Sequence, residues 1–338
     1  MPSRFPRAVF APVVPFAISV LLMLVVSAGN AAGPKIADPA QVDDDYALQG
    51  EYVGMLDTPD GKQKFGAQIV AQGEGVFNVV GYHGGLPGDG WNGEQRVRID
   101  NVKAENGVLQ FKDKHGSGVL KDGVITCTLA GSDKPSGKLR RVERTSPTLG
   151  AMPPPGAVVL FDGSSADAFK GGRVTDDGLL MEGVTSQRTF GDHSLHIEFR
   201  LPYQPQDRGQ GRGNSGIYLQ GRYEVQMLDS FGLEGKDNEC GGIYTVREPN
   251  VNMCLPPLVW QTYDIDFTAA KYDDGKLVAP PKATVRHNGV LIHEDVELSP
   301  TEGTRAAPVK AGPEPGPVYL QNHGCPVRYR NIWVVEKK

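Results

Sequence analysis

One short stretch of the sequence, GNSGIYLQGRYEVQMLDS at residues 213–230, is unusually rich in amide and carboxylate side chains. These side chains are Asn214, Gln220, Glu224, Gln226 and Asp229. Amides and carboxylates make hydrogen bonds in a fixed planar geometry, and carboxylates can also transfer protons. The stretch therefore predicts a surface that binds a polar ligand or carries out acid–base chemistry.

The stretch alternates as two β-strands joined by a turn, and the register decides which side chains share a face. A two-residue turn at Gly221 and Arg222 would mix polar and apolar residues on both faces. A three-residue loop, residues 220–222, sets Tyr218 opposite Glu224 and separates the faces. We therefore expect Tyr218, Glu224 and Gln226 on one polar face, with Asn214 close by. Asp229 has the wrong parity and needs a bulge or the strand end to join them.

Two further predicted strands have one apolar and one polar side. In SLHIEFRL, residues 194–201, the polar side carries His196, Glu198 and Arg200. In VYLQNHG, residues 318–324, Tyr319, Gln321 and His323 share a side. We expect these polar sides to join the hairpin in one hydrophilic surface. The competing interpretation is a structural network of salt bridges, such as Glu198 with Arg200.

Planar amides, carboxylates and arginines beside aromatic rings match the neighbouring hydroxyls of a sugar. Hydrolysis of a glycoside normally needs two carboxylates around the anomeric carbon. Gln226 occupies the central position of EVQMLD and cannot serve as acid or base, although Glu224 with Glu198 or Asp229 could supply a pair. The sequence has no serine nucleophile elbow, H-E-x-x-H motif or phosphate-binding P-loop.

Composition favours an all-β chain. Of the 338 residues, 43 are Gly and 26 are Pro, and no helical stripe is sustained over several turns. The Pro-rich stretch TSPTLGAMPPPGAV marks a boundary, because three consecutive prolines favour an extended spacer. We predict a small antiparallel β domain at residues 46–144, a linker at 145–156, and a second β domain at 157–338.

The N-terminus has the layout of a secretory signal peptide, since Arg4 and Arg7 precede an apolar run and small residues follow it. We expect cleavage near residue 32 and export to the periplasm or the exterior; an uncleaved anchor is the alternative. The leader holds two of the 35 basic side chains and none of the 40 acidic ones, so its removal changes the formal charge from −5 to −7. An acidic chain without a basic stripe is not expected to bind nucleic acid, nor to stay on a membrane after cleavage.

The sequence contains four cysteines, which allow three disulfide connectivities in an exported protein. Cys240 and Cys254 flank one loop, so we favour that pair. Metal ligation is the alternative, but neither cysteine has a second ligand at C-x2-C spacing.

Several longer motifs follow one another in the C-terminal half of the chain. LFDGSS, LHIEFRL, GNSGIYLQGRYEVQMLDS, WQTYDIDFTAAKYDDGK and GPVYLQNHGCPVRYRNIWV occur in order within residues 155–338. This segment closely resembles the 3-keto-disaccharide hydrolase family, which is also described as 3-keto-glucoside 1,2-lyase and 3-keto-2-hydroxy-glucal hydratase. The resemblance implies a concanavalin A-like jelly-roll sandwich that binds its ligand on a concave face. It also implies cleavage of an oxidised mono- or disaccharide by elimination, with a separate oxidoreductase producing the 3-keto sugar.

Elimination needs a base near C2, donors for the enolate oxygen and an acid for the leaving group. We expect His323 or Glu224 to be the base, Arg200 with Gln226 or Gln321 to stabilise the enolate, and Glu198 or Asp229 to be the acid or an orienting partner. Sugar contacts are expected from Asn214, Tyr218, Tyr244 and Arg328. No cofactor is expected, although a divalent metal on Glu224, Asp229 and His323 is an alternative. A non-catalytic lectin and an ordinary β-glucanase remain competing functions.

Overall fold

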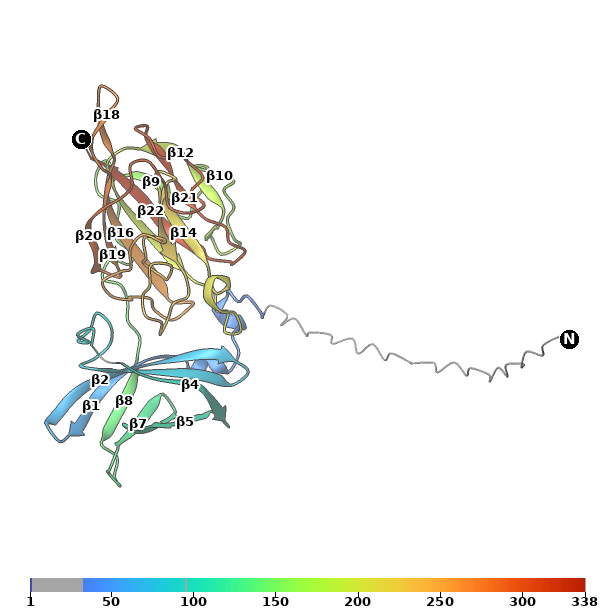
Figure 1. The fold of residues 1–338 in the computed structure, drawn as a ribbon, viewed down its shortest axis with the longest axis vertical. Coiled ribbons are helices and arrows are strands. Elements are labelled where there is room, and N and C mark those ends of the chain that lie inside the picture. Colours follow the sequence, from blue (N-terminus) through green and yellow to red (C-terminus); the bar gives the residue numbers. More distant parts are fainter. Residues whose placement is uncertain (2–32, 95, 338) are drawn as a thin grey trace. The chain divides into compact units, whose positions relative to one another are not determined.

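The computed structural model describes Met1, residues 33–94 and residues 96–337 (Figure 1). The predicted signal peptide therefore lies almost wholly outside the described residues. Residues 33–338 form one compact unit. None of the helices in the described part of the chain is long and apolar enough to span a membrane. The helical elements are short, namely η1 (Pro39–Gln41), α1 (Asp45–Leu48) and η2 (Gly209–Gly211).

The first eight strands form a closed antiparallel barrel in sequence order, with β1 pairing both β2 and β8. They are β1 (Gly50–Thr58), β2 (Gly61–Gly73), β3 (Val76–His83), β4 (Arg96–Glu105), β5 (Val108–Asp113), β6 (Gly116–Lys121), β7 (Val124–Leu129) and β8 (Gly137–Val142). Alternate residues such as Ile69, Phe77 and Leu120 fill the interior. Closure leaves no edge strand exposed, which protects a small β unit from aggregation.

The remaining strands form a sandwich of two antiparallel sheets, so the prediction of an all-β, jelly-roll-like chain is confirmed. The five-stranded sheet contains β10 (Phe169–Lys170), β12 (Val184–Phe190), β21 (Gly316–Leu320), β14 (Ser215–Leu219) and β15 (Tyr223–Met227). The seven-stranded sheet contains β11 (Leu180–Met181), β22 (Arg328–Glu336), β13 (His193–Arg200), β16 (Trp260–Thr268), β19 (Lys282–His287) and β20 (Val290–Glu297), with β9 (Val158–Phe161) pairing β22. A separate ribbon pairs β17 (Lys271–Asp273) with β18 (Lys276–Ala279).

Each sheet buries one face in the core between them. Ile197 and Phe199 come from one sheet, and Ile217 and Val225 from the other. Because successive residues of a strand point to opposite sides, the polar neighbours of these residues must point outward. The two outward faces look in opposite directions.

The hairpin of β14 and β15 has the predicted register. Tyr218 pairs with Glu224 and Ile217 with Val225, around a loop of three residues. Gln220 and Gly221 both have positive φ values, of 53° and 65°. The prediction of the longer loop is confirmed, and its consequence is a clean separation of polar and apolar faces.

The Pro-rich segment before residue 156 differs from a free spacer. Ser146 Oγ lies 2.6 Å from Thr262 Oγ1, and the Thr148 hydroxyl donates to Asp264 at 2.6 Å. The Gly150 N–H donates to Glu198 at 2.5 Å. This segment, residues 146–150, is thus bound to the outward face of the seven-stranded sheet, and we call it the strap.

Candidate active site

A cavity of about 310 Å³ lies on the outward face of the five-stranded sheet. Six residues predicted from the sequence line it, and they are Asn214, Glu224, Gln226, Tyr244, Gln321 and His323. Three further lining residues, Gln210, Arg305 and Ala306, were not predicted. Strand parity explains the predicted group, because Glu224 and Gln226 alternate with the core residues of β15.

Glu224 is the buried carboxylate of this cavity, with 2% of its surface exposed. Burial raises the pKa of Glu224 to about 7, and a hydrogen bond from Tyr218 opposes this rise only in part. The Tyr218 hydroxyl donates to Glu224 Oε2 at 2.7 Å and receives a hydrogen bond from Gln321 Nε2 at 3.1 Å. Burial, followed by the adjacent Glu224 carboxylate, raises the pKa of Tyr218, so the phenol stays protonated. A carboxylate with a pKa near neutrality is suited to general base catalysis.

Gly216 makes the room that this carboxylate occupies. A Cβ atom at Gly216 would lie 2.0 Å from Glu224 Oε1. The strand position carries no positive φ, so the glycine is needed for space and not for backbone conformation. Gly216 therefore helps to fix where Glu224 sits.

The cavity's amides form a network around Gln210. Gln210 Oε1 accepts hydrogen bonds from Asn214 Nδ2 at 3.0 Å and from Gln226 Nε2 at 3.1 Å. Gln210 Nε2 donates to the Asn238 carbonyl at 2.7 Å. Asn214 Oδ1 is buried and has no hydrogen-bond partner among the described residues. A ligand hydroxyl at this position would satisfy that acceptor.

The remaining lining side chains are more accessible. His323 and Arg305 are exposed, and Tyr244 is half-buried. Arg305 comes from a loop and Gln210 from the short helix η2, and neither has the strand alternation that a periodic pattern could report. The cavity thus combines one carboxylate, one guanidinium, one imidazole and four amides.

The expectation that β13 contributes to this surface is wrong. Glu198 accepts hydrogen bonds from the Gly150 N–H, from Arg330 Nε at 2.7 Å and from Asn331 Nδ2 at 2.9 Å. Burial would raise the pKa of Glu198, but hydrogen bonds from His196, Asn331, Gly150 and Arg330 outweigh it and lower the pKa to about 2. β13 belongs to the seven-stranded sheet, whose outward face is on the other side of the sandwich. Glu198 is part of a structural network there.

Tyr218, predicted to contact the sugar, is fully buried and does not line the cavity, although its hydroxyl donates to Glu224. Three other predicted residues, Arg200, Asp229 and Arg328, also lie outside the cavity. The Arg200 guanidinium lies over the Trp260 ring, 5.0 Å from its centroid, and donates to the Ala37 carbonyl at 3.0 Å. Asp229 accepts from Arg212 Nε at 2.6 Å, and Arg328 pairs with Glu182 at 2.8 Å. These ion pairs and the cation–π contact keep the three side chains in other surroundings.

The set of Glu224, Asp229 and His323 that was considered for a metal ion is not brought together, because Asp229 is bound to Arg212. Within the described ranges, no group of three or more His, Cys, Asp or Glu side chains is placed to hold an ion.

The cysteines differ from the prediction. All four are free thiols in the structure, including the predicted pair Cys240 and Cys254. These two thiols are buried neighbours, so the loop does bring them together. Cys240 Sγ lies 3.3 Å from the Tyr263 hydroxyl, and Cys254 Sγ donates to the Leu228 carbonyl at 3.5 Å. Burial, followed by the neighbouring Cys240, raises the pKa of Cys254.

Residues 156–335 match the sequence model of a 3-keto-alpha-glucoside-1,2-lyase-like domain. The chain belongs to this family. The 3-keto-alpha-glucoside-1,2-lyase-like domain spans nearly all of both sheets of the sandwich, and the barrel lies before it. The family resemblance inferred from the sequence motifs is therefore confirmed, and the protein is a carbohydrate-active, hydrolase-like enzyme.

Three crystal structures from Parabacteroides distasonis are similar to this chain, and each is described as a "putative glycosyl hydrolase". The first has 33% sequence identity and a TM-score of 0.49, and the match covers 54% of this chain and 85% of the other. The second has 19% identity and a TM-score of 0.40, covering 54% and 94%. The third has 18% identity and a TM-score of 0.38, covering 54% and 99%. No curated protein matches the chain.

Proposed function

We propose that the protein cleaves 3-keto-glycosides by removing the proton at C2 and eliminating the substituent at C1. The observation that supports this most directly is that the described lining of the cavity contains one carboxylate, Glu224, and that burial raises its pKa to about 7. Elimination needs a single base, whereas hydrolysis by displacement needs two carboxylates placed around the anomeric carbon.

The proposed reaction begins with the ketone at C3, which acidifies the neighbouring C2–H bond. Glu224 takes the proton, and the electron pair of that bond forms an enolate on the C3 oxygen. When the carbonyl at C3 re-forms, the pair moves between C2 and C1, and the C1–O bond breaks with its electrons on the leaving oxygen. That oxygen takes a proton from an acid. Addition of water across C1 and C2 would then complete a net hydrolysis.

The cavity offers a group for each of these needs. The Arg305 guanidinium, with the amides of Gln321 and Gln226, supplies donors for the enolate oxygen. Arg305 thereby takes the role that the sequence suggested for Arg200. His323 is exposed at the cavity and is assigned as the acid for the leaving group. Asn214 and Tyr244 are assigned as sugar contacts.

The test is to incubate the purified protein with a 3-keto-glucoside and with its unoxidised parent. Cleavage of the ketone alone supports the proposal, cleavage of the parent indicates a β-glucanase, and binding without turnover indicates a lectin. In deuterated water, the hydrated product should carry deuterium at C2, because the added water supplies that hydrogen. The unhydrated product has no hydrogen on C2 and is recognised by its C1–C2 double bond. A hydrated product without deuterium at C2 would contradict the elimination route.

We also propose that the protein is exported and acts beside a separate enzyme that oxidises glycosides at C3. The support is the signal-peptide layout at the N-terminus and the need for an already oxidised substrate. Mass spectrometry of the protein from its native cells should find the chain starting near residue 32. An intact N-terminus would contradict export by cleavage.

A further inference from the structure

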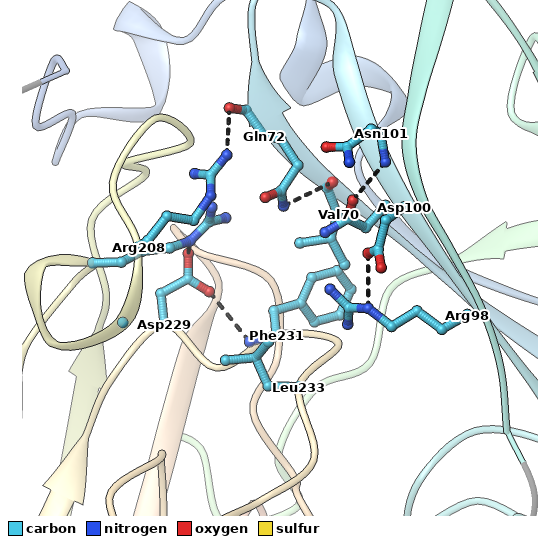
Figure 2. A pocket seen from close by; sticks show the side chains of 12 residues that line it. Val70, Gln72, Arg98, Asp100, Asn101, Arg208, Asp229, Phe231 and Leu233 are labelled. Atoms are coloured by element: carbon cyan, nitrogen blue, oxygen red, sulfur yellow. Dashed lines mark hydrogen bonds and ion pairs between the residues drawn. The ribbon is translucent and has the colours of Figure 1, made fainter. Parts of the chain in front are cut away.

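A second cavity, of about 350 Å³, lies where the barrel meets the sandwich. Figure 2 shows Arg98, Asp100 and Asn101 entering it from the barrel, with Arg208 and Asp229 facing them from loops of the sandwich. We call it the junction pocket. We infer that the junction pocket binds an acidic monosaccharide, a hexuronate, through its carboxylate. The inference does not depend on the reaction proposed above.

The charges of the junction pocket do not balance. Three guanidinium groups, those of Arg98, Arg208 and Arg212, line it together with two carboxylates. Arg212 Nε is bound to Asp229 at 2.6 Å, and Arg98 Nε to Asp100 at 2.8 Å. Both carboxylates of the pocket are therefore already paired.

Arg208 is the guanidinium left over. Its N–H groups donate to backbone carbonyls, those of Pro205 at 2.6 Å, Asp207 at 2.7 Å and Gln72 at 3.1 Å. The carboxylate of the preceding residue, Asp207, accepts from Gln204 Nε2 at 2.6 Å. No described carboxylate forms a salt bridge with Arg208, so the pocket carries one surplus positive charge.

An anion would compensate this surplus charge. Arg208 is exposed at the pocket, and partial burial of its side chain, followed by the positive charge of the buried Arg212, lowers the pKa of Arg208. A ligand carboxylate beside the guanidinium groups of Arg208 and Arg212 would accept charge-assisted hydrogen bonds, which are among the stronger ones in proteins. The charge pattern therefore selects an anionic ligand.

The rest of the lining matches a sugar ring. Val70, Phe231 and Leu233 supply an apolar wall, and Figure 2 shows the Phe231 ring beside Val70. The amides of Asn78 and Gln72 also line the pocket and can bond hydroxyl groups. The volume lies near the lower end of the range for small-molecule sites, which suits a single ring.

The pocket is formed before any ligand arrives, because hydrogen bonds hold its two sides together. Arg212 donates from both Nη atoms to the Ala71 carbonyl at 3.2 Å, and Arg98 Nη1 donates to the Gly232 carbonyl at 3.2 Å. A Cβ at Gly232 would lie 2.5 Å from Val70 Cγ2, so the barrel and the sandwich also pack closely at this point. A preformed site spares the ligand the cost of ordering the loops.

The experiment titrates the full mature chain separately with glucuronate, glucose and inorganic phosphate and measures each dissociation constant by calorimetry. We expect glucuronate to bind, glucose to bind at least tenfold more weakly, and phosphate to bind more weakly than glucuronate. Arg208→Gln should weaken glucuronate binding about tenfold or more, which is the scale of one charged hydrogen bond. The matched control Arg286→Gln removes an exposed arginine from β19 and should leave binding unchanged.

Two further variants decide where the ligand sits. Arg305→Gln changes the catalytic cavity and should not affect glucuronate binding, whereas Asn78→Ala should weaken it. The inference is overturned if glucuronate does not bind, if Arg305→Gln but not Arg208→Gln abolishes binding, or if glucose binds equally well. Phosphate binding as tight as that of glucuronate would also overturn it, because the pocket would then recognise only an anion. None of these readouts requires activity on a 3-keto-glycoside.

Discussion

Glu224 and Glu198 are both buried glutamates on outward faces of one sandwich, with 2% and 1% of their surfaces exposed. They differ in what surrounds them. Glu224 receives one side-chain hydrogen bond, from the Tyr218 phenol, and burial raises its pKa to about 7. Glu198 receives hydrogen bonds from Arg330, Asn331 and the strap, and its pKa falls to about 2.

The difference shows that burial alone does not make a carboxylate reactive. Burial opposes ionisation in both residues, and the number and charge of the donors decide the outcome. A base must be able to accept a proton at working pH, which Glu224 can and Glu198 cannot. In the proposed mechanism, opposite faces of the same fold serve chemistry and stability.

The largest expected effect is on turnover. Glu224→Gln should reduce kcat/KM for a 3-keto-glycoside by about 10²–10⁴-fold, the range for a lost general base. Glu198→Gln, the matched control, should leave kcat/KM of the folded protein within about threefold, since a remote structural residue does not touch the substrate. Steady-state kinetics measure both, and equal losses would erase the proposed difference between the faces.

A second experiment moves Glu224 without removing it. Gly216→Ala places a methyl group against Glu224 Oε1 and should lower kcat about tenfold or more, because misplacement of a catalytic group by about 1 Å is costly. Gly191→Ala is the control, since a Cβ there meets nothing within 4 Å. If both variants retain full activity, the position of Glu224 is not critical.

The third experiment concerns stability. The pKa of Glu198 is lower in the folded protein than the ordinary 4.5, so its ionised form stabilises the fold above pH 4.5 and this contribution is lost as the pH falls toward 2. Glu198→Gln should therefore lower the free energy of unfolding at pH 7 by about 1–3 kcal/mol. The loss should shrink on acidification. Urea unfolding between pH 3 and pH 8 measures it, and a loss that is independent of pH would contradict the ionic role.

Glu224 should show the opposite sign. Its folded pKa is raised, so the protein is most stable when Glu224 is neutral and loses stability as the pH rises through about 7. Glu224→Gln should raise the free energy of unfolding at pH 8 by about 1–3 kcal/mol and have little effect below pH 4.5. The same urea series tests this. If Glu224→Gln lowers the free energy of unfolding at pH 8, ionised Glu224 does not destabilise the fold and the prediction is wrong.

The smallest expected effect is on the pH profile. If ionised Glu224 is the base, as proposed, kcat/KM should rise with pH through a limb near pH 7. The Tyr218 hydrogen bond lowers the pKa of Glu224, so Tyr218→Phe should move this limb upward by up to about one pH unit. A limb that moves downward or stays in place would show that another group titrates.

The sequence predicted one of the two faces well. Alternation and loop length in the stretch from Asn214 to Gln226 determined its register, and these local rules hold because a one-residue slip would expose the core face. Parity also placed Glu198 on an outward face. It could not say which sheet β13 joins, because that depends on pairing with β16 and β22, which are far away in the sequence.

Residues outside the strands were not predicted for another reason. Gln210 and Arg305 line the cavity because the backbone between the strands folds back toward it. No periodic pattern in the sequence predicts that course of the backbone. Closure of the barrel was missed likewise, since it rests on the pairing of β1 with β8 across most of the barrel's sequence. Alternation within a strand predicts which residues share a face. Pairing between strands that are distant in the sequence decides which strands lie in the same sheet.

The strap has a consequence for anyone who shortens this chain. The family match starts at residue 156, but the Gly150 N–H, Ser146 and Thr148 bind the outer surface of the sandwich. Truncation at the family boundary would remove at least six hydrogen bonds from that surface, since the Ala151 carbonyl also accepts from Asn331 and Trp333, and would leave Glu198 without one of its donors. The smallest piece that folds like the whole protein therefore begins upstream of the family domain.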